Sequence, residues 1–334
     1  MARSSVARIG RVAGAATVAA FIALAGGSGA ARAGQTWDMP TPYGDNNFHT
    51  INIKQFADDV KAATGGALTI TVHSAGSLIK HPEIKNAVRG GQVPIGEFLL
   101  SRLSNENAVF QIDSIPFLAV NYADAARLWA ASRPAIEKLL DRQGLKVLFA
   151  VPWPPQGLYA KKEINTVADL KGLKFRAYNT ATERLAQLAG AVPTQVEVPD
   201  IPQAFATGRV AAMITSPSTG ANTKAWDFVS NFYHTQAWLP KNVAVVNEKA
   251  FARLDKKTRA AVLDAAAKAE ARGWEASKAE TADKIAVLKK NGMTVRDPSP
   301  ALADGLKKIG ATMTEEWLAK TGDTGAAILK AYRK

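Results

Sequence analysis

The sequence of 334 residues contains no cysteine, and this absence excludes several kinds of chemistry. No disulfide can form, no thiol can act as a nucleophile, no thiolate can hold a metal, and no lipid can be attached to an N-terminal cysteine. The histidines are few and dispersed, without an HExxH pattern. They lie at positions His49, His73, His81 and His234. We therefore expect neither a metal site nor a cofactor.

Other signatures of enzymes and of nucleic-acid binding are missing as well. There is no GxGxxG segment and no P-loop, and the stretch Gly26-Gly27-Ser28-Gly29, which is similar to a nucleophile elbow, falls in a segment that we expect to be removed. Lysines and arginines do not form a run with interleaved aromatic residues, although the formal net charge is +13. Catalytic triads are spatial and leave no motif, yet this pattern favours a binding protein. We expect no enzyme activity and no nucleic-acid partner.

One stretch of the chain combines basic, apolar and small residues in the order of a signal peptide. Three arginines in the first 11 residues precede the apolar residues 12–25, and the small-x-small pattern Ala31-Arg32-Ala33 follows. The apolar part is shorter than the ~20 residues that span a bilayer. We predict a signal peptide at residues 1–33 and a mature protein in the periplasm. Removal of the leader takes away four arginines and no acid, so the net charge falls from +13 to +9.

The remaining 301 residues (334 minus 33) exceed what one simple core holds, which indicates two lobes. Short strand patterns alternate with helical ones, and this alternation favours an α/β fold. The expected strands cover residues 35–39, 67–73, 93–95, 145–151, 158–160 and 173–176. The expected shorter helices run from Asn46 or Asn47 to the stop at Gly65 and Gly66, and over residues 82–89, 122–142 and 299–320.

The longest uninterrupted helical pattern lies near the C-terminus. It begins at Asp255, a typical N-cap, and ends at Asn291 and Gly292, a typical C-cap pair. Between them there is no proline and a single glycine, Gly273. At ~1.5 Å per residue this helix would be about 50 Å long. A helix of that length is expected to cross more than one lobe.

Two segments more than a hundred residues apart are similar to each other. Residues 88–98 and 205–215 each contain the end of a helix, a glycine, one further residue, a valine and a short strand. In open α/β sheets, ligands bind outside the carboxyl ends of the strands. We therefore expect the ends of these two strands to face one cleft.

Several short segments follow one another in an order that is typical of one family. They read FADDV at 56–60, TGGALTITV at 64–72, GSL at 76–78, DSIPFL at 113–118, DLKGLKFR at 169–176 and GAVP at 190–193. Over about residues 35–290 the chain thereby resembles the periplasmic solute-binding proteins of tripartite ATP-independent periplasmic (TRAP) transporters, the DctP type.

The resemblance implies a two-lobed periplasmic binding protein fold, with mixed sheets flanked by helices and one long C-terminal helix spanning both lobes. We place lobe I at residues 34–153 plus 242–281 and lobe II at 154–241 plus 282–334. The resemblance also implies that Arg176 forms a salt bridge with the carboxylate of a ligand. The planar guanidinium fork matches the two oxygens of a carboxylate, which makes such charge-assisted pairs strong.

Four further candidates follow from the expected crossover and from the second strand of the internal repeat. Trp153 and Gln156 lie at the first crossover between lobes, where a packed hinge is the alternative role. Thr215 and Ser216 end the strand after Gly208. The family often has an asparagine there that bonds the carboxylate, so their hydroxyls are expected to replace it, unless they only form a turn.

The remaining candidates are spread over the expected cleft. Glu97 and Phe98 end the first strand of the internal repeat, and His49 closes an entrance loop that starts at Tyr43. Asn179 follows Arg176 by three residues. Trp238 lies near the third crossover, where a place in the core is its alternative role.

We predict a periplasmic receptor that binds a small organic monocarboxylate, such as an aromatic, 2-oxo or hydroxy acid, in the cleft between the lobes. As a monomer it would deliver this ligand to the small and large subunits of a TRAP permease. Some relatives have a second cleft arginine where this chain has Gln156, which favours a monocarboxylate. A C4-dicarboxylate receptor of the same family is an alternative, as are an ABC-type uptake receptor and a periplasmic hydrolase with a spatial Ser/His/Asp set.

Overall fold

The computed structural model describes residues 34–334, so the leader that we predict at residues 1–33 lies outside the described residues. The described part alternates strands and helices from its first element to its last, as an α/β fold requires. Among residues 34–334, no helix has both the length and the apolar character that crossing a membrane demands.

The strands of residues 34–334 form three sheets. A parallel pair joins β1 (Gln35–Pro40) to β2 (Leu68–His73). An antiparallel sheet has the order β3 (Ile95–Leu99), β10 (Lys241–Asn247), β4 (Leu145–Pro152). The third sheet has six strands in the order β11 (Thr294–Arg296), β9 (Asn231–Tyr233), β5 (Gly157–Ala160), β8 (Ala212–Thr215), β6 (Lys174–Ala177), β7 (Val192–Gln195). Strand β6 is parallel to both neighbours, whereas β5 is antiparallel to β8 and β9, so this sheet is mixed.

Helices flank these sheets. The α-helices are α1 (Phe48–Ala63), α2 (Ile84–Arg89), α3 (Tyr122–Asp141), α4 (Thr180–Leu188), α5 (Ile201–Ala206), α6 (Pro217–Asn222), α7 (Glu248–Ala252), α8 (Lys256–Lys290) and α9 (Pro300–Tyr332). Short 3-10 helices connect them: η1 (His81–Glu83), η2 (Leu100–Asn105), η3 (Ala108–Ser114), η4 (Val167–Leu170), η5 (Val198–Asp200) and η6 (Ala225–Asp227).

The capping residues of α1 and α8 confirm the helix boundaries expected from the sequence. The side chain of Asn47 accepts a hydrogen bond from the backbone N–H of His49, and α1 ends just before the left-handed glycines Gly65 and Gly66. The side chain of Asp255 accepts a hydrogen bond from the N–H of Thr258 at the start of α8. Each cap satisfies a backbone donor that the first turn of a helix leaves free.

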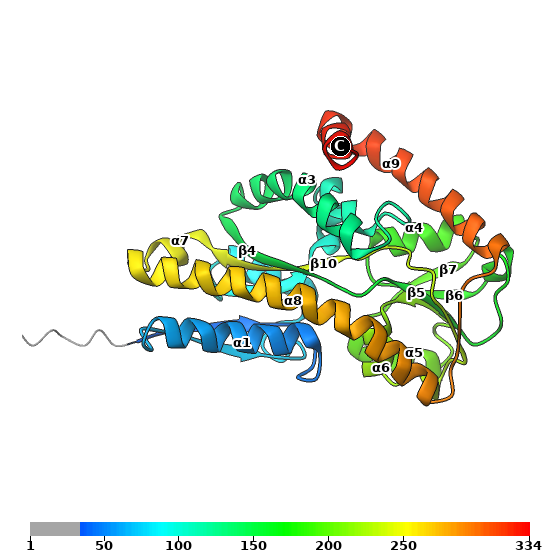
Figure 1. Cartoon of the computed structure of the whole chain (residues 1–334), viewed down its shortest axis with the longest axis horizontal. Helices are drawn as coiled ribbons and strands as arrows, with labels where there is room; N and C mark the ends of the chain where they lie inside the picture. Colours follow the sequence, from blue (N-terminus) through cyan, green and yellow to red (C-terminus); the bar gives the residue numbers. More distant parts are fainter. Residues whose placement is uncertain (1–33) are drawn as a thin grey trace, which may run out of the picture. The chain divides into compact units, whose positions relative to one another are not determined.

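Helix α8 packs along elements that belong to different sheets (Figure 1). Its middle contacts α1 and β4, where Asn52 donates a hydrogen bond to the carbonyl of Ala269. Its last third contacts α6, where the hydroxyl of Ser218 bonds to Glu280. Gly273 makes the close approach possible, because a Cβ at this position would lie 2.4 Å from Cγ2 of Val151. The long helix expected from the sequence is therefore confirmed, and its one glycine has a packing role.

Three expected elements differ from the structure. The strand expected at residues 93–95 begins only at Ile95 and runs to Leu99, because Pro94 cannot donate to the ladder with β10. The first turn of the helix expected at 82–89 is the 3-10 helix η1. Helix α9 continues past the expected end at residue 320, with a kink at Gly322 (φ 54°, ψ −135°) that only glycine adopts readily.

Candidate ligand-binding site

A small pocket lies where the second and third sheets approach each other. The chain passes between these two sheets in the segments after β4 and before β10, and both segments contribute to the lining. The pocket is lined by Tyr43, His81, Leu99, Arg102, Trp153, Gln156, Arg176, Tyr178, Glu197, Val198, Thr215, Thr219 and Pro240.

Arg176 is the cation at the base of this pocket, and its side chain is only 1% exposed. It lies on β6, a strand with neighbours on both sides. Its Nε donates a hydrogen bond to the carbonyl of Val196 (3.0 Å), whereas its buried Nη1 has no partner. No ion pair among the described residues includes Arg176. The site thus holds a buried positive charge without an acid to balance it, which is costly unless an anion binds there.

The surroundings of Arg176 change its proton affinity but not its charge at neutral pH. Burial lowers the pKa of Arg176 to about 10, because the charged form loses its hydration. The guanidinium carbon lies 5.0 Å from the ring centroid of Tyr178, a cation–π distance that partly offsets this loss. Burial also raises the pKa of Tyr178, so this phenol stays neutral. Arg176 therefore remains a cation in the pH range in which a periplasmic protein works.

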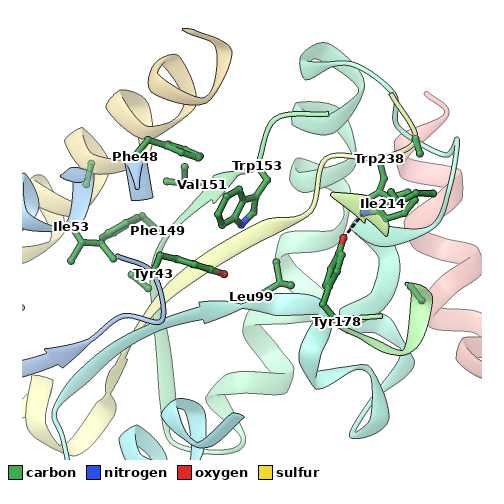
Figure 2. Packing of buried hydrophobic residues seen from close by; sticks show 14 of the residues in the cluster. Tyr43, Phe48, Ile53, Leu99, Phe149, Val151, Trp153, Tyr178, Ile214 and Trp238 are labelled. Atoms are coloured by element: carbon green, nitrogen blue, oxygen red, sulfur yellow. Dashed lines mark hydrogen bonds between the residues drawn. The ribbon is translucent and has the colours of Figure 1, made fainter. Parts of the chain in front are cut away.

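Aromatic side chains form two walls of the pocket (Figure 2). The rings of Tyr43 and Trp153 meet edge to face, with centroids 4.9 Å apart. The Tyr43 hydroxyl (3.2 Å) and the Trp153 Nε1 (2.9 Å) both donate to Oδ1 of Asn242. On the opposite wall, Tyr178 accepts from Nε1 of Trp238 and donates to Oε1 of Gln156. These buried hydrogen bonds fix the orientation of the rings.

Glu197 contacts two side chains that come from the 3-10 helices η1 and η2. Its Oε1 pairs with Nη1 of Arg102 (2.8 Å), and its Oε2 lies 3.4 Å from Nδ1 of His81. The backbone N–H of Leu99 donates to Nε2 of His81, so the proton of the neutral imidazole resides on Nδ1 and points to Glu197. Arg102 also donates to the carbonyl of Tyr178. These three charged or polar side chains form a cross-pocket cluster.

The electrostatics of this cluster keep Glu197 ionised and His81 neutral. Burial alone would raise the pKa of Glu197, but the hydrogen bond from His81 and the charge of Arg102 lower it to about 2. Burial is the largest influence on His81 and lowers the pKa of its imidazole, although Glu197 opposes this change. The pocket lining therefore contains two cations, Arg102 and Arg176, and one anion.

The structure places four of the sequence candidates in the pocket lining, namely Arg176, Trp153, Gln156 and Thr215. Trp238 lies one layer behind, bonded to Tyr178. Ser216 and Asn179 are N-caps, of α6 and α4, and Asn179 also donates to the hydroxyl of Ser101.

The other three candidates also lie outside the pocket lining. Glu97 is buried between Thr41, whose hydroxyl donates to it (2.6 Å), and His49, whose Nδ1 is 3.4 Å away. The ring of His49 packs at a tilt of 51° against Trp153, with centroids 4.4 Å apart. Phe98 packs in the hydrophobic core beside α2 and α3. In this part of the pocket it is the next residue, Leu99, at the end of β3, that reaches the lining.

Several lining residues were missed by the sequence interpretation, above all Tyr178, Glu197, His81 and Arg102. For Tyr178 a signal exists, because residues i and i+2 of a strand share a face and Arg176 is two positions earlier. Glu197 follows β7, the parallel neighbour of β6, so it lies at the same carboxyl edge of the sheet. His81 and Arg102 belong to 3-10 helices, whose residues carry no periodic pattern. In residues 34–334 there is no cluster of acids and histidines that could hold a metal ion.

Residues 41–321 match the model of the family described as bacterial extracellular solute-binding protein, family 7 (DctP). The chain belongs to the DctP family. Three solved structures of this kind resemble it along nearly their whole length. DctP7 of Bordetella pertussis, an extracytoplasmic solute receptor binding pyroglutamic acid, is 49% identical, with 90% of this chain and 100% of that chain covered and a TM-score of 0.89.

Two further DctP-family structures are nearly as similar. DctP6 of B. pertussis, which also binds pyroglutamic acid, is 44% identical, with 90% and 99% covered and a TM-score of 0.89. A TRAP solute-binding protein from an unidentified microbe of a marine metagenome, specific for pyroglutamate, is 43% identical, with 90% and 99% covered and a TM-score of 0.88. The expected TRAP receptor family and its two-lobed α/β fold are thus confirmed.

Proposed function

We propose that this DctP-family protein captures a small organic monocarboxylate in the pocket around Arg176, with pyroglutamate as the first ligand to test. The observation that carries the proposal is the buried guanidinium of Arg176, which has no acidic partner and an unbonded Nη1. A ligand carboxylate would accept from this group and neutralise it. Such charge-assisted, bidentate pairs are among the strongest contacts that a binding site can offer.

The rest of the pocket suits a compact, partly apolar acid. Tyr43 and Trp153 form an apolar wall, while Thr215, Thr219 and Gln156 offer hydroxyl and amide groups. Pyroglutamate combines one carboxylate with a small flat ring that has an amide N–H and a C=O. The three similar structures that bind it are 43% to 49% identical to this chain. At that similarity a shared ligand class is the best-supported starting point.

A C4-dicarboxylate receptor of the same family is the nearest alternative. A second carboxylate needs a second free cation in the pocket. The other arginine of the lining, Arg102, is already paired with Glu197 at 2.8 Å, and Gln156 carries no charge. An ABC-type receptor for amino acids would use an acid of the pocket to meet an ammonium group, but the charge of Glu197, the one acid of the lining, is already balanced by Arg102. A hydrolase remains the most distant alternative.

Ligand transfer would proceed by closure of two lobes in the periplasm. We assign lobe I to residues 34–153 plus 242–281 and lobe II to 154–241 plus 282–334. Contacts that span the pocket, such as Arg102 to Glu197, stabilise the closed form, and a ligand that touches both sides shifts the population further toward it. The closed monomer would then deliver its ligand to the small and large subunits of a TRAP permease.

A thermal-shift screen with the periplasmic, leader-free protein tests this function. Ligand that co-purifies is first removed by unfolding in guanidinium and refolding, which is simple because no disulfide has to re-form. The panel contains pyroglutamate, aromatic and 2-oxo acids, C4-dicarboxylates, sugar acids and amino acids. A ligand at ~100 times its Kd stabilises the folded state by about 2.7 kcal/mol. We expect the largest shift with pyroglutamate, whereas shifts confined to amino acids, or none, would contradict the proposal.

A further inference from the structure

The acid of the pocket lining, Glu197, directly follows Val196, whose carbonyl accepts a hydrogen bond from the cation that would bind the ligand, Arg176. Both Arg176 and Glu197 line the same small cavity, yet they form no ion pair with each other. Each oxygen of Glu197 instead contacts one side chain from a 3-10 helix, Arg102 of η2 or His81 of η1. The pocket therefore has an unpaired cation at Arg176 and, beside it, an anion at Glu197 that is already paired with Arg102.

A charge count of the lining follows directly. Arg102 and Glu197 neutralise each other, His81 is neutral, and Arg176 leaves a single positive charge. Other charged groups nearby do not alter this count at the lining itself. Glu97 lies behind the wall, between Thr41 and His49. Asp113 accepts from the backbone N–H of Lys241, and these two opposite charges lie together outside the lining.

We propose that Glu197 is the specificity-determining residue of the pocket, because it rejects a second ligand carboxylate and accepts a hydrogen bond from an N–H or O–H group of the ligand. The inference rests on the proposed function, since it concerns the ligand held by Arg176. A dicarboxylate would bring two negative charges to a pocket with one free positive charge. Its second carboxylate would meet either the apolar wall or the ionised Glu197, and two like charges that approach each other in a buried site repel strongly.

The acceptor role follows from the number of lone pairs. A carboxylate has about four acceptor sites, and the contacts to Arg102 and His81 use two of them. The two acceptor sites of Glu197 that remain free face a ligand, because Glu197 lines the cavity and stays ionised. A ring N–H, such as that of a lactam, would donate a hydrogen bond to one of these sites. A ring oxygen at the same place has no hydrogen to donate, and its lone pairs would repel those of the carboxylate. Specificity of this kind comes from leaving a wrong ligand unpaired.

Isothermal titration of the leader-free protein and its Glu197→Gln variant tests the inference. The ligands are pyroglutamate, the lactone acid in which a ring oxygen replaces its N–H, and glutarate. In the wild-type protein we expect pyroglutamate to bind about 10-fold or more tightly than either analogue, as one lost polar contact implies. In Glu197→Gln, Arg102 loses its partner and the pocket gains a positive charge. We expect the glutarate-to-pyroglutamate ratio of Kd values to fall by about 10-fold or more.

Two further variants keep the test decisive. Glu316→Gln removes a comparable ion pair, with Arg184 between α4 and α9, outside the pocket, and we expect no change in any ratio. Arg102→Gln leaves Glu197 unbalanced, so the affinity for every carboxylate should fall, by about 10-fold or more for pyroglutamate. If Glu197→Gln does not fold, Arg102→Gln tests the role of Glu197 in its place, and an unchanged affinity for pyroglutamate would contradict that role.

The outcomes separate this inference from the proposed function. If the wild-type protein binds pyroglutamate but Glu197→Gln leaves the ratio within about twofold, the selectivity role of Glu197 is wrong while the receptor function stands. If wild-type protein binds the lactone acid as tightly as pyroglutamate, the acceptor role is wrong. If it binds no carboxylate at all, both proposals fail.

Discussion

Arg102 on η2 and Glu197 at the start of η5 form a 2.8 Å ion pair across the pocket that Arg176 lines. The pair is reinforced nearby by hydrogen bonds from Asn179 to Ser101 (2.8 Å) and between the hydroxyls of Ser104 and Thr180 (2.6 Å). All three contacts connect the segment around η2 to the segments around α4 and η5. These polar contacts hold the two sides of the pocket together without a ligand.

The ion pair predicts a loss of stability in acid. The pKa of Glu197 is lowered from 4.5 to about 2 in the folded protein, so its contribution is complete above pH 4.5 and disappears as the pH falls toward 2. In ligand-free protein, the difference in unfolding free energy between wild type and Glu197→Gln should shrink over this window. Denaturant melts at several pH values measure it. A difference that stays constant from pH 6 to about 2 would contradict the assignment.

Because Gly273 is closely packed, we predict that replacing it with valine lowers the stability of the protein strongly. A Cβ there would lie 2.4 Å from Val151 and 2.7 Å from Nδ2 of Asn52, so Gly273→Val must push α8 away from β4 and α1. We expect destabilisation by about 1–3 kcal/mol or more, as for other overpacked sites. Ala271→Val, at an exposed position on the same helix, serves as the control for the helix propensity of valine. Equal melting temperatures for the two variants would contradict this packing role.

Asn242 is predicted to act on ligand affinity without touching the cavity. Its Oδ1 accepts hydrogen bonds from both Tyr43 and Trp153, which form the aromatic wall. Asn242→Leu leaves these two buried donors unpaired, at a cost of about 1–3 kcal/mol each. We expect weaker binding of all carboxylates with unchanged ligand preference, measured by titration calorimetry. Tyr43→Phe removes one of the two bonds and should have the smaller effect. An altered preference in Asn242→Leu would show that Asn242 itself contacts the ligand.

Much of the framework could be predicted from the sequence, because local signals determine it. Asn47 and Asp255 are capping residues, and they place the starts of α1 and α8 correctly. The internal repeat correctly predicted two strands whose ends face one cavity, since Leu99 of β3 and Thr215 of β8 both reach it. Pattern and capping act within a few residues, so they are visible in a single chain.

Which side chains reach the pocket lining could not be predicted from the sequence in the same way. Trp238 and Glu97 have suitable chemistry and lie in the expected region, but they are one layer behind the lining. His81 and Arg102 reach the lining from 3-10 helices, and their approach to Glu197 depends on how the two sheets pack. Which of two neighbouring residues faces a cavity is set by tertiary packing over long sequence separations, which no local pattern records.

The most direct test of carboxylate capture is a titration of refolded wild-type protein and Arg176→Met with pyroglutamate. Methionine keeps much of the volume and removes the charge, and Arg184→Met, on a half-buried arginine that is paired with Glu316 outside the pocket, is the matched control. We expect both variants to fold, the control to bind like wild type, and Arg176→Met to lose about 2–5 kcal/mol of binding free energy. Unchanged affinity in Arg176→Met would show that Arg176 does not hold the ligand and would contradict the proposed function.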